Sequence, residues 1–78
     1  MQKNVEQTVK DLMAIVLNLD AARIDDGTSM DNTPGWDSAN HINLVLALEE
    51  EFSISFEVSE FEMMTTYFDV MQVVNAKI

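Results

Sequence analysis

The spacing of hydrophobic residues near the start of the chain predicts a helix over 4–18. Hydrophobic residues recur there at steps of three and four, which places them on one side of a helix. They are Val5, Val9, Leu12, Val16 and Leu19. Asn4, followed three residues later by Gln7, indicates a capping box, in which each side chain reaches the free backbone N–H of the other. The first element is therefore expected to be an amphipathic helix with one buried face.

Residues 20–36 contain both glycines, the only proline and four aspartates, and they predict a loop. A connection of about 17 residues exceeds the two to eight that usually join neighbouring helices. A loop of this length is expected either to have a function or to be held by side chains. Ile24 and Met30 are the side chains expected to hold it.

The next hydrophobic segment, 38–52, predicts a helix with two apolar faces. At about 100° per residue, one face collects His41, Leu44, Val45, Leu48 and Phe52. Nearly opposite lie Ala39, Ile42 and Leu46, with Glu49 and Glu50 beside them. A helix needs one apolar stripe for its own core. The second stripe is expected to be covered by more protein or to remain exposed for a partner.

The last third of the chain predicts a short helix around 58–63 and a longer helix over 66–77. Ile54, Phe56 and Val58 alternate with polar residues, as in a strand. A single strand has no partner in an otherwise helical chain, so an extended stretch before the short helix is favoured. Thr66 is expected to cap the last helix. The fold class predicted is all-α: a small four-helix bundle, three helices long and one short, with a long loop between the first two, forming one domain over 1–78.

Composition narrows the function. The 78 residues include 4 Lys and Arg against 14 Asp and Glu, a net charge of −10. Neither nucleic acid nor an anionic membrane surface suits so acidic a protein. The chain has no cysteine, hence no disulfide and no thiol nucleophile, which fits a reducing compartment. With no apolar run of membrane-spanning length and no signal peptide at the start, a cytoplasmic monomer is expected. One histidine leaves little acid–base machinery, so a binding or carrying role is favoured over an enzyme.

The most informative motif is Gly35-Trp36-Asp37-Ser38, where the loop meets the helix over 38–52. Asp37 or Ser38 can cap the helix by accepting a hydrogen bond from a free backbone N–H. Alternatively, Ser38 carries a covalent group, because a helix N-terminus favours a phosphate. The residues alone leave both interpretations open.

This motif, followed by LVLALEEEF over 44–52, resembles the acyl carrier proteins. The resemblance extends over almost the whole chain, through its length, its acidity, the long first loop and Thr65-Thr66 before the last helix. It implies that Ser38 receives 4′-phosphopantetheine from coenzyme A through a phosphodiester, with Asp37 as its usual neighbour. The thiol of that arm would hold acyl intermediates as thioesters in fatty acid, polyketide or related biosynthesis. The protein would then be a carrier and not an enzyme.

The resemblance also implies partners: a phosphopantetheinyl transferase, and acyl-loading and acyl-transferring enzymes with basic docking surfaces. The residues expected to bind them are Ala39, Ile42, Leu46, Glu49 and Glu50. Carboxylates at a helix C-terminus oppose the helix dipole, and such a local cost is typical of a partner-facing site. Ala39 stands where the family usually has Leu, Ile or Met, and Asn40 and Asn43 stand where fatty-acid carriers commonly have acidic residues. These departures favour a dedicated pathway over bulk fatty-acid synthesis.

Several other side chains have a packing interpretation and a functional one. His41, on the core side of its helix, is expected to pack at the boundary of the core rather than act as a base or ligand. Trp36 is expected to pack against His41, or alternatively to contact the prosthetic arm or a partner. Five more hydrophobic side chains are expected to pack in the core, or alternatively to line a cavity that opens for an acyl chain. They are Met63, Met64, Met71, Phe56 and Phe61.

Two other function classes remain open from the sequence. One is an acidic helical adaptor without a prosthetic group, and the other is an interaction module regulated by phosphorylation of Ser38. A metal site is not predicted, because an EF-hand register of ligands is not matched by Asp25, Asp26, Gly27 and Asp31.

Overall fold

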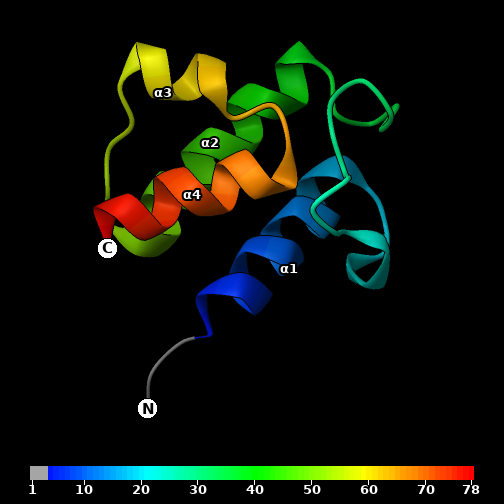
Figure 1. The fold of residues 1–78 in the computed structure, drawn as a ribbon, viewed down its shortest axis with the longest axis horizontal. Coiled ribbons are helices and arrows are strands. Elements are labelled where there is room, and N and C mark those ends of the chain that lie inside the picture. The colour runs from blue at the N-terminus through cyan, green and yellow to red at the C-terminus, as the bar shows by residue number, and fades with distance from the viewer. Residues whose placement is uncertain (1–3) are drawn as a thin grey trace.

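The first helix, α1, spans Val5–Leu17 in the computed structural model, which describes residues 4–78 (Figure 1). One of the two hydrogen bonds of the predicted capping box is present. The Asn4 side chain accepts a hydrogen bond from the Gln7 backbone N–H at 3.1 Å. The second half of the predicted capping box is wrong, because the Gln7 amide donates instead to Asp11, one turn further on, at 2.8 Å. The helix ends at Asn18, which adopts the left-handed conformation with φ of 56°, a common way to end a helix.

Three further helices complete the predicted bundle: α2, Ser38–Phe52; α3, Val58–Met63; and α4, Tyr67–Lys77. A short 3-10 turn, η1, Ala21–Arg23, lies in the long loop before α2. The all-α class and the pattern of three long helices and one short are therefore confirmed. The residues before α3 are extended and form no strand within 4–78.

The long loop is fixed to the turn between α3 and α4. Ile24 is buried and Met30 is half-buried against the core, which confirms both predicted anchors. The Met30 N–H donates to the Thr65 carbonyl at 3.0 Å, and the Tyr67 N–H donates to the Thr28 carbonyl at 2.9 Å. The loop therefore holds the start of α4 as well as the approach to α2.

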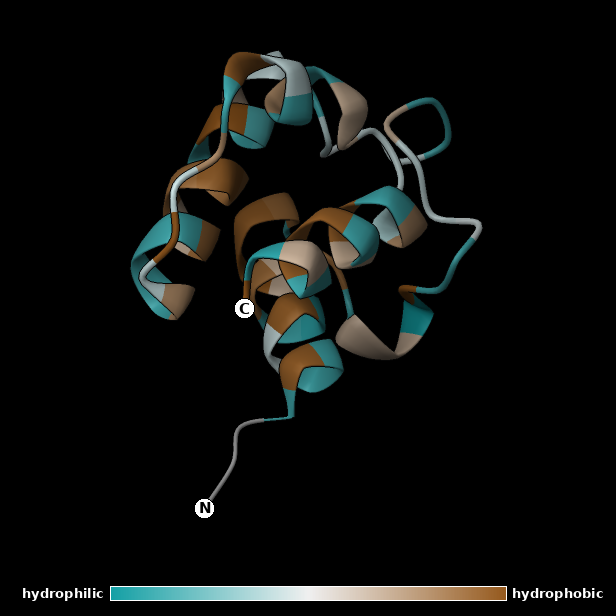
Figure 2. Cartoon of the chain, turned by 60° about the vertical axis from the view of Figure 1, so that its left-hand side comes forward, coloured by the Kyte–Doolittle hydropathy of each residue, from teal (hydrophilic) through white to brown (hydrophobic). Residues whose placement is uncertain are grey.

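Hydrophobic residues from α1, α2, α4, the long loop and the residue that follows α3 share one core. Each helix carries both a hydrophobic and a hydrophilic side (Figure 2). The core consists of Val9, Met13, Leu17, Ile24, Trp36, Leu44, Val45, Leu48, Met64, Tyr67, Val70, Val73 and Val74. Each fully buried aliphatic side chain contributes about 1.5–3 kcal/mol. The prediction that Met63 fills the core is wrong, since it is 60% exposed. The six-residue α3 ends at Met63, and it is the next residue, Met64, that turns inward.

Helix α3 contributes no buried side chain, so polar links are important in holding it. Its first turn is a capping box in which the Glu60 carboxylate accepts from the Glu57 N–H at 2.8 Å. Lys77 of α4 pairs with Glu60 at 2.9 Å. The backbone hydrogen bond first, and the lysine second, hold the pKa of Glu60 below its ordinary value. Ahead of α3, the Phe56 N–H donates to the Glu49 carboxylate at 2.8 Å.

Candidate functional site

The residues before α2 are shaped by close packing against the end of α1. A Cβ atom on Gly35 would lie 2.3 Å from the Leu17 carbonyl oxygen, so only glycine fits there. In addition, the Asn40 side-chain amide donates to the Gly35 carbonyl at 2.7 Å. Trp36, the next residue, is only 2% exposed. The Gly35–Ser38 turn is therefore held both by α1 and by the first turn of α2.

The two candidate capping residues have different roles. The Asp37 carboxylate accepts from the Asn40 backbone N–H at 2.9 Å and is the N-cap of α2. Ser38 is the first residue of the helix, and its side chain is exposed. A phosphate ester on this hydroxyl would lie at the positive end of the helix, near free backbone N–H groups. The arrangement thus accommodates a covalent phosphate group without disturbing the cap.

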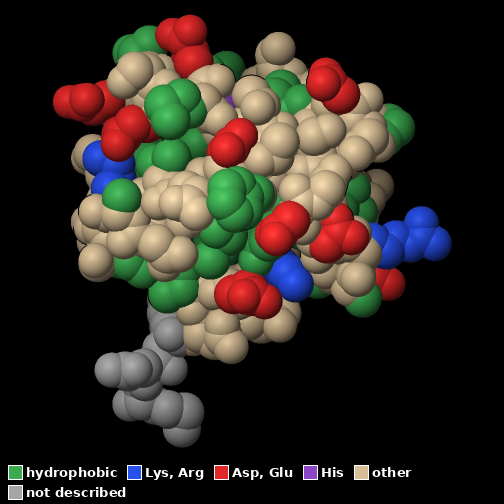
Figure 3. Space-filling model, viewed as in Figure 1, with side chains coloured by type: hydrophobic (Ala, Val, Ile, Leu, Met, Phe, Trp, Pro, Cys, Tyr) green, Lys and Arg blue, Asp and Glu red, His purple; other side chains and the backbone are tan. Residues whose placement is uncertain are grey.

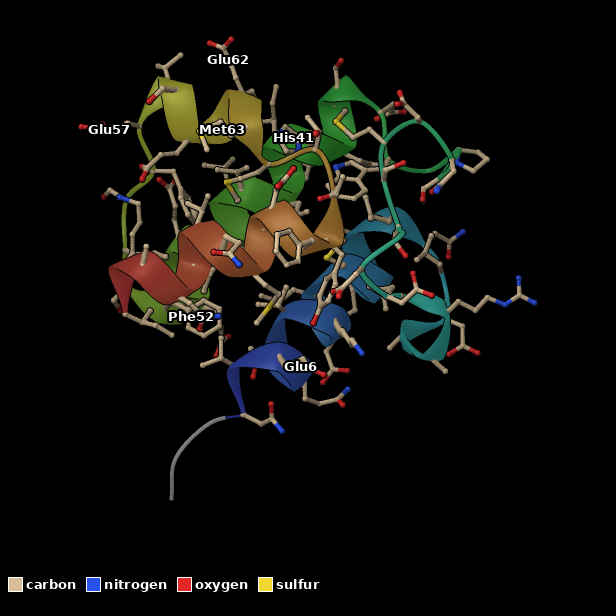
Figure 4. All side chains as sticks on the ribbon, viewed as in Figure 1. Glu6, His41, Phe52, Glu57, Glu62 and Met63 are labelled. Atoms are coloured by element: carbon tan, nitrogen blue, oxygen red, sulfur yellow. The ribbon has the colours of Figure 1, made fainter. Side chains whose placement is uncertain are left out.

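His41 connects the turn to α3 through both ring nitrogens. The Trp36 indole N–H donates to His41 Nδ1 at 3.1 Å, and His41 Nε2 lies 2.8 Å from the Phe61 carbonyl oxygen. An indole nitrogen can only donate and a carbonyl can only accept, so the proton resides on Nε2 and the ring is neutral. His41 is 4% exposed and lies on the side of α2 that faces α3 (Figure 4). The predicted packing of Trp36 on His41 is confirmed, with hydrogen bonds that the sequence did not indicate.

A groove begins at Ser38 and continues between α2 and α3. Its first part, of about 270 Å³, is lined by Ser38, Met30, His41, Ile42, Phe61, Glu62 and Thr65. Ile42 and Phe61 also line the second part, of about 370 Å³, with Val45, Leu46, Glu49, Phe56, Glu57 and Val58. Both Phe56 and Phe61 therefore line this α2–α3 groove, whereas Met64 belongs to the core. Glu62 points away from the bundle (Figure 4).

Comparison with protein families identifies this architecture. The family model described as a phosphopantetheine attachment site matches residues 7–74. The chain belongs to the phosphopantetheine-binding carrier family. The resemblance to acyl carrier proteins is thereby confirmed, and 4′-phosphopantetheine is the prosthetic group of this domain.

Membership of this carrier family indicates which enzymes the domain meets. Carrier domains of the family interact with phosphopantetheinyl transferase and with acyl-handling enzymes, and they are not catalytic themselves. An exposed serine hydroxyl at a helix N-terminus fits the phosphate end of the prosthetic group. Within residues 4–78, every helix is too short or too polar to traverse a bilayer.

The carrier's α2 has the two faces that its sequence predicted. His41, Leu44, Val45 and Leu48 are buried, whereas Ile42 and Leu46 are 50% and 57% exposed. Ala39 and Glu50 are also exposed, and Glu49 is half-buried because one of its oxygens holds the segment before α3. Acidic side chains are spread over the face of the carrier shown in Figure 3. An exposed apolar stripe is thus present on a strongly acidic protein.

Proposed function

We propose that this carrier holds acyl intermediates as thioesters on a 4′-phosphopantetheine arm attached to Ser38, in a dedicated biosynthetic pathway. The observation that carries the proposal is the exposure of Ser38 at the first position of α2 while the neighbouring Asp37 supplies the cap. Attachment at Ser38 leaves every described hydrogen bond of the turn in place.

Attachment requires that the Ser38 oxygen form a bond to phosphorus as the phosphoanhydride of coenzyme A breaks and adenosine 3′,5′-bisphosphate departs. The hydroxyl proton must leave at the same time. His41 lines the same part of the groove, but both of its ring nitrogens are already engaged by Trp36 and Phe61. His41 is therefore not the base that accepts the proton, and the contribution of the carrier at this position is presentation of the hydroxyl.

The exposed stripe of α2 is the proposed docking surface for client enzymes. It consists of Ala39, Ile42 and Leu46, with Glu49 and Glu50 at its acidic end. A net charge of −10 favours fast, weak encounters with basic surfaces. The small side chain of Ala39 leaves the stripe less apolar beside Ser38, which favours a restricted set of partners.

The α2–α3 groove is the proposed shelter for a small apolar acyl group. Its second part is lined mainly by hydrophobic side chains, and its first part includes Ser38. A flexible arm anchored at Ser38 starts at the mouth of this groove. Burial of an apolar chain there is favourable by about 0.8 kcal/mol per methylene group.

The test of attachment is an intact-mass measurement. The purified chain is incubated with coenzyme A and a broad-range phosphopantetheinyl transferase. A gain of one phosphopantetheine is expected for the wild type and for the matched control Ser55→Ala, which changes another exposed serine. No gain is expected for Ser38→Ala. An unmodified wild type would leave the acidic adaptor and the phosphorylation-regulated module as the alternatives.

A further inference from the structure

The geometry around His41 points to a role beyond packing. We propose that His41 is a positioning residue whose neutral Nε2–H form fastens α3 to the Gly35–Ser38 turn, and that protonation of its ring releases α3 and opens the α2–α3 groove beside Ser38. The consequence for the prosthetic arm rests on the proposed function, whereas the link itself does not.

The Phe61 carbonyl lies in the last turn of α3, where carbonyl groups lack partners within the helix. In a continuing helix its donor would be the Thr65 N–H, but that N–H donates to the Met63 carbonyl at 2.9 Å. His41 Nε2 lies 2.8 Å from the Phe61 oxygen. The imidazole of α2 therefore replaces the missing helical donor and fixes the end of α3.

This link depends on the protonation state of the ring. The Trp36 indole N–H needs a lone pair on His41 Nδ1, and a doubly protonated imidazole has none. Both side chains are nearly inaccessible, at 2% and 4% exposure, so solvent does not readily replace the lost bond. Protonation would leave two N–H groups facing each other, and the ring would have to turn away from Trp36 and, with it, from Phe61.

The surroundings of His41 contain few groups that could hold its charge. Asp37 precedes it by one turn at the N-cap of α2, and Glu62 lies on α3 at the same part of the groove. Among residues 4–78 neither carboxylate forms an ion pair with the ring. The loop and the segment before α4 contribute Met30, Trp36 and Thr65 there, none of which titrates near neutral pH.

Helix α3 is suited to respond because it buries no side chain of its own. At its start it remains attached through Glu60 to Lys77. Its end is held by the His41 link and by ring contact between His41 and Phe61, whose centroids lie 4.6 Å apart. The residues that follow are fixed separately, by burial of Met64 and by the hydrogen bond from Met30 to Thr65. Release of the link would therefore loosen the last turn of α3 beside Ser38 while the segment before α4 stays in place.

The chain has one histidine and one tryptophan, so NMR reports the link without overlap. The unloaded wild type is titrated from pH 8 to pH 5, following the His41 ring nitrogens, the Trp36 indole N–H and the hydrogen exchange of α3 amides. We expect the Nε2–H tautomer at high pH and a Trp36 shift with the midpoint of His41. After correction for intrinsic exchange, α3 amides should exchange roughly tenfold faster at low pH, while α1 amides do not. An Nδ1–H tautomer, or a Trp36 signal that ignores His41, would overturn the proposal.

Two variants separate the hydrogen bonds from packing. His41→Phe keeps an aromatic ring but neither bond, and its α3 should exchange fast at every pH. Trp36→Phe leaves His41 intact, and its histidine should lose the fixed tautomer while remaining titratable. Wild-type exchange of α3 in His41→Phe would show that packing alone holds the helix, contrary to the proposal. Because all measurements use the unloaded chain, they are independent of whether Ser38 accepts the arm.

Discussion

Replacement of Gly35 by alanine tests how tightly the turn before Ser38 is held. The added Cβ would meet the Leu17 carbonyl oxygen at 2.3 Å and its carbon at 3.3 Å. These are backbone atoms of α1, so no side-chain rotation relieves the contact. The Asn40 side chain also holds the Gly35 carbonyl through a hydrogen bond. Either α1 or the turn must therefore move.

Gly27→Ala is the matched control, because Gly27 and Gly35 are the only glycines and neither has a positive φ. At Gly27 the nearest atom is a side-chain oxygen of Asp25 at 3.3 Å, which accepts from the Gly27 N–H and needs to move by only a few tenths of an ångström. Alanine is therefore conformationally permitted at both positions, and only the steric contact differs. We expect Gly27→Ala to be neutral or stabilising by up to about 1 kcal/mol.

For Gly35→Ala the cost of an overpacked contact is expected to be about 3 kcal/mol. In a chain of this size that loss lowers Tm by roughly 12–24 °C. Urea and thermal unfolding measure the stability, and transferase labelling at a temperature where both variants are folded measures the presentation of Ser38. We expect slower labelling of Gly35→Ala than of Gly27→Ala. Equal stability of the two variants would refute the close approach of the turn to α1.

Three further changes test separate contacts. Asn40→Ala removes the bond to the loop carbonyl and should cost about 1 kcal/mol in urea unfolding; an unchanged midpoint would contradict that bond. In Lys77→Met the pKa of Glu60 should rise only part of the way to its ordinary value, because the backbone hydrogen bond that contributes most to the lowering remains. A lowered pKa of Glu60 stabilises the fold above pH 4.5, and this stabilisation is lost as pH falls through the folded-state pKa. Acid unfolding of Lys77→Met should therefore depend less on pH than that of the wild type. Carboxyl NMR titration measures the change in the pKa of Glu60 directly. Burial raises the pKa of Tyr67 to about 12, and within residues 4–78 its hydroxyl has no hydrogen-bond partner; Tyr67→Phe should therefore be neutral or stabilise by about 1 kcal/mol, and a clear destabilisation would indicate a bonded hydroxyl.

The helices were predictable because their local signals agree with their packing. The cap at Thr66 is formed by its hydroxyl accepting from the Asp69 N–H at 3.0 Å, as the spacing predicted. The two faces of α2 follow directly from helical periodicity, with Leu44 buried and Leu46 exposed. Even the ambiguous alternation of Ile54 and Phe56 was settled correctly, since a strand without a partner leaves its backbone unpaired.

Contacts between segments distant in sequence were not predictable in the same way. The bond from His41 to the Phe61 carbonyl depends on where α3 ends, and the role of Glu49 depends on how the chain returns after α2. The hydrophobicity of Met63 predicts a core residue, but Met63 lies on the outer side of the last turn of α3, opposite to the face that Phe61 turns toward the core. A side chain's type predicts that it can bond or pack, whereas its partner is set by the tertiary path of the chain.

The same distinction changes the interpretation of the neutral residues at the start of α2. Asn40 stands where fatty-acid carriers commonly have an acidic residue, and this suggested a surface adapted to particular enzymes. In the structure its amide donates to the Gly35 carbonyl, which a carboxylate cannot do. Neutrality at this position therefore follows from the fold of the turn and carries no information about partners. The exposed Ala39 and Asn43 donate no such bond to the loop among the described residues, so these two departures from the family pattern remain free to reflect the choice of partners.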